Sequence, residues 1–311
     1  MDAPLNETPG WTGPRTRTAA ALLVALVTVG ASATLFGRGN AVERPEAGRT
    51  SAGGGVVPGF QLDSTGPTGG EIWRGAIPGA ARESLVYLPP GYAPGQRYPV
   101  AYLLAGMPGS PWSYVHALHL ASAADTLITQ GGAQPFVAVM PVAGPSGHYA
   151  GEWAGPWENY VVSNVVPWVD AHLSTIATPG GRTIAGLSAG GFGAIDIALR
   201  HVRLFGRVES WGGYFSPVAD GPLAHASRAL LAAHDPKALA RRNAPLLRTL
   251  GTRFFVSTGP GHGHVTVADT VRFDELLATL HLPHRLELLP SRKNMWERQL
   301  VDGLRWAFVT H

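Results

Sequence analysis

The sequence contains no cysteine, which excludes a disulfide framework, a thiolate metal site and a cysteine nucleophile. Charged residues are also scarce, at 14% of the 311 residues, and the formal net charge is only +3. Nearly all of the positive charge is arginine, spread along the chain without a basic block or an aromatic-interleaved basic run. We therefore expect no nucleic acid partner.

The first strong signal is an uncharged stretch at residues 18–37, which follows Arg15 and Arg17 and is long enough to span a bilayer. The small residues Ala31-Ser32-Ala33 also resemble a signal-peptidase site. The segment is therefore predicted to be either a transmembrane anchor or a cleaved signal peptide. Either interpretation predicts an exported protein, held at the membrane facing outward or secreted.

Four segments follow from this pattern. Residues 1–17 are predicted to be a cytoplasmic N-terminal segment, and residues 18–37 the anchor or signal peptide. Residues 38–59 carry Gly, Pro and Ser without periodicity and are predicted to be a flexible linker. Residues 60–311, part of a chain that is 45% hydrophobic, are long enough for one large α/β domain.

Apolar runs of strand length alternate with amphipathic stretches of helix length from residue 81 onward. Strands are predicted at 84–89, 99–106, 135–142, 182–188, 206–214, 253–259 and 284–290, and helices at 158–173, 191–201, 266–282 and 295–309. This alternation predicts an α/β fold, with a doubly wound, mostly parallel sheet covered by helices on both faces. Ligands of such sheets bind beyond the carboxyl ends of the strands.

The pattern Gly186-Leu187-Ser188-Ala189-Gly190 lies between a predicted strand and a predicted helix. Gly-x-Ser-x-Gly in this context is typical of a serine nucleophile on a strained turn, where the neighbours must be small. Such a turn would aim the Ser188 hydroxyl into the cleft and direct the Ala189 N–H at an oxyanion. A plain turn is the alternative interpretation.

Residues 151–215, together with PVAYLLAGMPGSPWSY at 99–114, resemble the putative-esterase family of α/β hydrolases, which includes esterase D and the mycolyltransferases. The likeness extends from about residue 84 to the C-terminus and implies an α/β-hydrolase fold. In that family a Leu-Leu-His-Gly-x-x-Gly loop supplies the second oxyanion donor. The resemblance assigns that donor to the Met107 N–H, and Ala105 replaces the usual histidine.

In this family the serine nucleophile works with an acid and a histidine, and the resemblance fails at both of these positions. The family's acid would follow the strand at 253–259, but the loop there has no carboxylate until Asp269. The family's histidine would follow the last strand, where Lys293 stands. A lysine in a polar turn stays mostly protonated and cannot accept the proton of Ser188.

Two histidines could replace the missing base. His262 and His264 lie in the glycine-rich loop after residue 259, and Asp269, Asp274 or Glu152 could orient the ring. The alternatives are a polar loop without a catalytic role, or a metal site that lacks a visible third ligand. We expect neither a resident metal nor a cofactor.

Aromatic residues surround the predicted cleft mouth, and among them Trp112 and Trp153 are expected to contact substrate. His116 and His119 fall in a helical stretch and His148 in a loop, where surface or packing roles are favoured.

These observations predict an exported serine esterase or acyltransferase acting on a small-molecule, lipid or glycan ester. The alternative is a pseudoenzyme, a non-catalytic α/β-hydrolase-fold protein that binds an envelope lipid, a glycan or a protein partner. A metal-assisted hydrolase is a third hypothesis.

Overall fold

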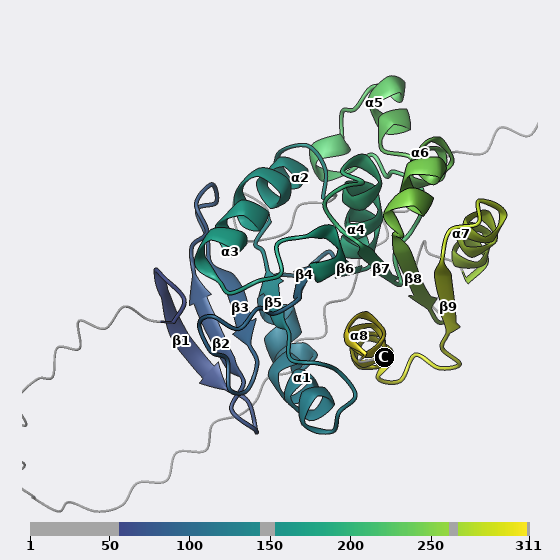
Figure 1. Ribbon diagram of the computed structural model, residues 1–311. Coiled ribbons are helices and arrows are strands. Elements are labelled where there is room, and N and C mark those ends of the chain that lie inside the picture. Colours follow the sequence, from purple (N-terminus) through teal and green to yellow (C-terminus); the bar gives the residue numbers. More distant parts are fainter. Residues whose placement is uncertain (1–55, 144–152, 261–266, 310–311) are drawn as a thin grey trace, which may run out of the picture. The chain divides into compact units, whose positions relative to one another are not determined.

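The computed structural model describes residues 56–143, 153–260 and 267–309 (Figure 1). The strands are β1 (Phe60–Thr65), β2 (Glu71–Gly75), β3 (Ser84–Leu88), β4 (Val100–Leu104), β5 (Val137–Met140), β6 (Arg182–Leu187), β7 (Arg207–Trp211), β8 (Arg253–Thr258) and β9 (His284–Leu288). The α-helices are α1 (Leu120–Thr129), α2 (Pro156–Tyr160), α3 (Val166–His172), α4 (Ala189–Arg200), α5 (Arg228–Ala233), α6 (Pro236–Leu250), α7 (Val267–Thr279) and α8 (Met295–Phe308).

The segments predicted at 1–17 and 18–37, and nearly all of the linker at 38–59, lie outside the described residues. Within the part that the structure describes, no helix has the length and hydropathy needed to cross a bilayer.

One sheet of nine strands holds the domain together, in the order β1-β2-β3-β5-β4-β6-β7-β8-β9. From β5 to β9 the neighbouring strands are parallel, whereas β1, β2, β3 and β5 pair antiparallel. The prediction of a mostly parallel sheet is confirmed, and every strand predicted from the apolar runs is present. The hairpin formed by β1 and β2 was not predicted.

Helices cover both faces of the sheet (Figure 1). Along β4, Val100 and Tyr102 belong to the core beneath α3, α4, α6 and α7, whereas Ala101 and Leu103 belong to the core beneath α1 and α8. Successive side chains of a strand point to opposite faces, so a strand covered on both faces reads as an unbroken apolar run. This is why the central strands were visible in the sequence.

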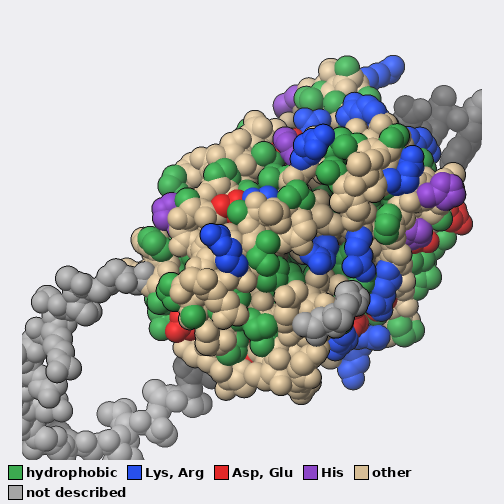
Figure 2. All heavy atoms as spheres, viewed as in Figure 1, with side chains coloured by type: hydrophobic (Ala, Val, Ile, Leu, Met, Phe, Trp, Pro, Cys, Tyr) green, Lys and Arg blue, Asp and Glu red, His purple; other side chains and the backbone are tan. Residues whose placement is uncertain are grey.

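Positive side chains gather on one part of the face seen in Figure 2, over the region of α6, β9 and α8. The exposed arginines of these three elements include Arg241 and Arg242 on α6, Arg285 on β9, and Arg298 and Arg305 on α8. They come from segments that are far apart in the chain. A basic run therefore does not appear in the sequence.

The β1–β2 hairpin is tied to α1 through Asp125, which is fully buried. Asp125 Oδ2 accepts hydrogen bonds from Thr68 N at 2.8 Å and Gly70 N at 3.2 Å, and Oδ1 accepts one from Tyr87 Oη at 2.9 Å. A Cβ on Gly70 would lie 2.0 Å from Asp125 Oδ1, so only glycine allows this approach. One carboxylate thus fixes the antiparallel end of the sheet to the helical layer.

We expect Asp125→Ala to lower the free energy of unfolding by about 2–4 kcal/mol, because it leaves buried N–H and O–H groups without acceptors. Urea denaturation measures the loss. Thr126→Ala, at the neighbouring exposed position of α1, is the control and should change stability little. Equal stability of the two variants would show that the carboxylate does not hold the hairpin.

Candidate active site

Ser188 lies at the junction of β6 and α4, as the sequence predicted. Its backbone has φ 52° and ψ −115°, a strained conformation for a residue with a side chain. Its N–H donates to the carbonyl of Trp211 at the end of β7, at 2.9 Å. Ala189 is the first residue of α4, so its N–H has no carbonyl partner within the helix. The helix N-terminus therefore presents a free backbone donor beside the serine hydroxyl.

The turn at Ser188 requires glycine on both sides because the neighbouring backbones are so close. A Cβ on Gly190 would lie 2.0 Å from the carbonyl oxygen of Leu104, and one on Gly186 would lie 2.3 Å from the backbone of Gly190. A Cβ on Gly106 would lie 2.8 Å from the carbonyl oxygen of Leu187. The loop after β4 therefore packs directly against the serine turn, which brings the Met107 backbone next to it.

Two buried side chains hold the end of β4 in place. Tyr114 Oη donates to the carbonyl of Leu104 at 2.8 Å, and Trp153 Nε1 donates to the carbonyl of Ala105 at 2.9 Å. Trp153 was predicted to contact substrate, but it is fully buried and packs against Gly193 of α4. The structure thus places Trp153 under the loop that follows β4. Its bond to the Ala105 carbonyl supports the loop at the position where the family usually has histidine.

A cavity of about 250 Å³ opens at Ser188. The residues that line it are Gly106, Met107, Pro108, Gly109, Ser113, Ala117, Leu118, Leu187, Ser188 and Trp296. None of these described lining residues carries a carboxylate, an imidazole or an amine. The cavity is therefore suited to an apolar group attached to an ester carbonyl.

The predicted bases and acids are only partly placed. His262, His264, His148 and Glu152 lie outside the described residues. Lys293 is exposed in the turn before α8, and its exclusion as a base for Ser188 stays a prediction.

The remaining candidate acids lie on α7 and have partners of their own. Asp269, in the first turn of α7, accepts a hydrogen bond from Arg272. Asp274 Oδ1 lies 3.4 Å from His284 Nε2. Of these two acids, Asp269 is nearer in sequence to the loop that carries His264.

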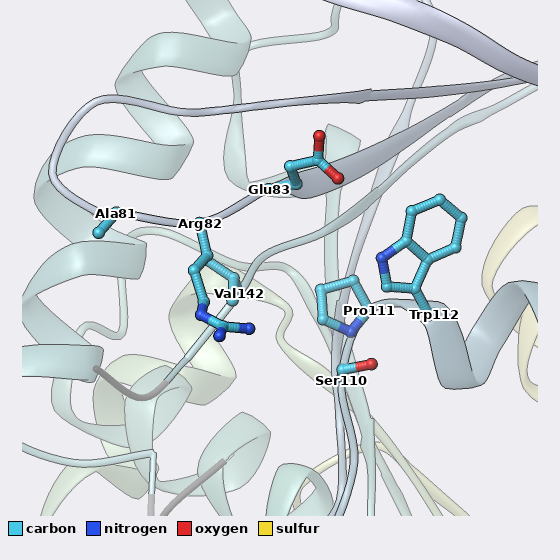
Figure 3. A pocket seen from close by; sticks show the side chains of 7 residues that line it. All are labelled: Ala81, Arg82, Glu83, Ser110, Pro111, Trp112 and Val142. Carbon is cyan, nitrogen blue, oxygen red and sulfur yellow. The ribbon is translucent and has the colours of Figure 1, made fainter. Parts of the chain in front are cut away.

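Trp112 lines a second cavity of about 400 Å³, together with Arg82 and Val142 (Figure 3). Its expected contact with substrate stays a prediction. His116 stacks on Trp112, and His119 directly precedes α1; both histidines are exposed. Neither histidine is among the residues that line the cavity at Ser188.

One group of described residues brings metal-ligating atoms together. Glu158 of α2, Asp196 of α4 and His234 after α5 are all buried, and each offers an atom within 4.8 Å of the others. These atoms already have protein partners: Glu158 Oε1 accepts from Arg200 at 2.7 Å and contacts His201 Nε2 at 2.8 Å. The group forms a buried polar network toward the end of α4 that is remote from Ser188.

The protonation of this network follows from burial and hydrogen bonding. Burial opposes ionisation of Glu158, yet the bonds from His201 and Arg200 outweigh it and lower its pKa. Burial raises the pKa of Asp196, although His234 Nδ1 lies 2.6 Å from its Oδ2. The network therefore joins α2, α4 and α5 by charge-assisted hydrogen bonds.

A buried carboxyl group lies on β7, the neighbour of the strand that leads to Ser188. Glu209 of β7 is 1% exposed and accepts a hydrogen bond from Trp211 Nε1 at 2.8 Å. Gly303 of α8 packs on this pair, and a Cβ there would lie 2.3 Å from Glu209 Oε2. Burial raises the pKa of Glu209 from 4.5 to about 8, because little except the Trp211 bond and the charge of Arg207 stabilises the ionised form.

Comparison with known proteins places this chain among esterases. The family described as "Putative esterase" matches residues 76–307. The chain is 34% identical over 134 residues to Esterase Rv1288 of Mycobacterium tuberculosis, covering 41% of this chain and 28% of that protein. It is 31% identical over 146 residues to an endo-1,4-beta-xylanase/feruloyl esterase of Xylanibacter ruminicola, covering 43% of this chain and 19% of that one. The matched parts span less than a third of these relatives.

Solved structures share the architecture. A ferulic acid esterase superposes with a TM-score of 0.66 at 18% identity, covering 80% of this chain and 98% of that chain. An S-formylglutathione hydrolase from Agrobacterium tumefaciens superposes with a TM-score of 0.60 at 18% identity, covering 79% and 97%. These likenesses confirm the predicted α/β-hydrolase fold.

We expect the contribution of Glu209 to the free energy of unfolding to fall as the pH rises from about 4.5 through about 8, since the folded state holds a proton on Glu209 that the unfolded state releases. One such group contributes a slope of at most ~1.4 kcal/mol per pH unit. Glu209→Gln keeps an acceptor for Trp211 and should remove this part of the slope, so the stability of the variant relative to the wild type rises between about pH 4.5 and about pH 8 and is constant above pH 8. Chemical denaturation across this pH range measures both slopes.

The control for this prediction is Glu275→Gln at an exposed position of α7. Its stability should run parallel to that of the wild type. If the stability of Glu209→Gln also changed with pH in parallel with the wild type, the buried carboxyl would not titrate between about pH 4.5 and about pH 8.

Proposed function

We propose that this chain, which belongs to the putative-esterase family of α/β hydrolases, hydrolyses carboxylic esters through Ser188. The observation that carries the proposal is the backbone geometry at Ser188. The strained turn, the N-terminus of α4 and the Gly106–Met107 loop meet at one point, and a cavity opens there.

The chemistry follows from these groups. Ser188 Oγ attacks the ester carbonyl carbon, and the Ala189 and Met107 N–H groups stabilise the negative charge on the carbonyl oxygen. The bond from carbon to the alkoxy oxygen then breaks, and the alcohol leaves with the proton that came from Ser188. Water releases the acyl group in the second half of the reaction, and a different acceptor alcohol would make the same site an acyltransferase.

Proton transfer needs a base, and the proposal assigns that role to His262 or His264. Both follow β8 in the chain, and the carboxyl end of β8 lies at the same edge of the sheet as Ser188, which follows β6. Asp269, in the first turn of the next helix, is the proposed orienting acid. An α/β-hydrolase-fold binding protein without catalysis is the competing proposal, because the described lining of the Ser188 cavity has no ionisable side chain.

We also propose that segment 18–37 directs export. Protein recovered from the envelope fraction of an expressing bacterium should either retain its full mass, as an anchored protein, or begin after Ala33, as a processed one. Full-length protein confined to the cytosolic fraction would contradict export.

We expect a fluorophosphonate probe to modify Ser188 and to abolish hydrolysis of p-nitrophenyl acetate. Ser188→Ala should remove labelling and lower kcat/KM by ~10³-fold or more, since an intact oxyanion site alone supports only residual catalysis. Ser122→Ala, exposed on α1, is the matched control and should label like the wild type. Wild-type protein that neither labels nor hydrolyses would favour the binding protein.

The same assay identifies the base. His262→Ala or His264→Ala should slow labelling by about 10²-fold, in line with the usual contribution of a general base. If both variants label at the wild-type rate, neither histidine accepts the proton.

A further inference from the structure

The cavity of about 400 Å³ is separated from the Ser188 cavity by a single turn of chain. Ser110 lines the larger cavity and Ser113 lines the one at Ser188. Ser110 N donates to Ser113 Oγ at 3.2 Å, and Ser113 N donates to the Ser110 carbonyl at 3.0 Å. We call the larger cavity, lined by Ala81, Arg82, Glu83, Ser110, Pro111, Trp112 and Val142, the Arg82 cleft. A ligand with its ester group at Ser188 would cross this turn to reach the cleft.

Trp112 forms an aromatic wall of the Arg82 cleft. Figure 3 shows Arg82 and Trp112 on opposite sides, with Pro111 between them. His116 stacks on the indole with ring centroids 5.1 Å apart and an interplanar angle of 6°. Since Trp112 is fixed by this stacking and Pro111 and Val142 are buried, the wall is ordered before a ligand arrives.

Arg82 supplies the charge of the cleft. Among the described residues no acid forms an ion pair with Arg82. The neighbouring acid, Glu83, is already engaged, because its Oε1 accepts a hydrogen bond from Arg74 Nη1 at 3.0 Å. In Figure 3 the side chains of Arg82 and Glu83 extend in opposite directions, as expected for consecutive residues leading into a strand. The cleft therefore offers a guanidinium that no described acid pairs with, opposite an indole.

We propose that the Arg82 cleft binds the alcohol part of the ester, and that this part is a planar ring carrying a carboxylate. This inference rests on the proposed esterase function. The ring would pack on Trp112, and the carboxylate would accept paired hydrogen bonds from the fork of Arg82. The acyl part would take the apolar cavity at Ser188, which is lined by Leu118, Leu187 and Trp296.

Two matched esters test the proposal directly. 4-Acetoxybenzoate and its methyl ester, methyl 4-acetoxybenzoate, release alcohols of nearly the same shape, of which only the first is an anion. Arg82→Ala should lower kcat/KM for 4-acetoxybenzoate about tenfold, the usual effect of losing a hydrogen-bonded charge, and leave the methyl ester within twofold. Arg203→Ala, an exposed arginine outside the cleft, is the control and should change neither. Equal effects of Arg82→Ala on both esters, or no effect on either, would overturn the proposal.

A second pair checks which side of the ester the cleft holds. 4-Nitrophenyl hydrogen succinate carries its carboxylate on the acyl side, and 4-nitrophenyl butyrate is its neutral counterpart. The ratio of kcat/KM for this pair should be the same in Arg82→Ala as in the wild type. A ratio that changes here, with no change for the acetoxybenzoate pair, would overturn the assignment of the cleft to the alcohol.

A binding measurement separates failure of this inference from failure of the proposed function. In Ser188→Ala protein, tryptophan fluorescence should report tighter binding of 4-hydroxybenzoate than of its methyl ester. The preference should be lost in Arg82→Ala, and binding of both compounds should weaken in Trp112→Ala. This result would support the cleft even if the wild type hydrolyses no ester. Absence of any preference would overturn the inference even in an active esterase.

Discussion

Three backbone segments meet at Ser188 with no side chain between them. The end of β4, the turn after β6 and the first turn of α4 are close enough that a single Cβ at Gly186 or Gly190 would overlap a neighbouring main chain. The end of β4 is in turn held by hydrogen bonds from Tyr114 and Trp153. The positive φ of Ser188 is therefore imposed by its surroundings, as strain at a functional residue must be. Both proposed oxyanion donors are backbone N–H groups, so the site tolerates Ala105 in place of a histidine side chain.

The sequence predicted the central part of the fold because a strand buried on both faces is a continuous apolar run, which can be recognised locally. β4 and β5 read as unbroken apolar runs, and the helix at 191–201 follows its strand directly. The β1–β2 hairpin has no continuous apolar run, since most of β1 is exposed. The hairpin is held in place by Asp125, which is distant in the sequence. α6 was overlooked although it carries a visible start signal. Asp235 caps its N-terminus and Pro236 occupies its first turn.

In the candidate site, too, the sequence predicted some features and missed others. Ser188 and Ala189 belong to one short motif, and the sequence was enough to place both at the strand-to-helix turn. Trp153 shows the limit of local reasoning, because an aromatic residue near a predicted cleft can equally be a buried support. The Arg82 cleft gives the same lesson, since its residues come from three separate segments and meet only in the folded sheet.

The contact between Gly303 and Glu209 links α8 to β7, the strand whose Trp211 carbonyl accepts the Ser188 N–H. The missing side chain at one position makes room for the carboxyl group at the other. In evolutionary terms the two positions are not free to vary separately: a lineage that places a larger residue at 303 must also shorten or replace the acid at 209. Paired changes at these positions across homologous sequences would record that dependence, and an engineer redesigning α8 would need to treat the two residues as one unit.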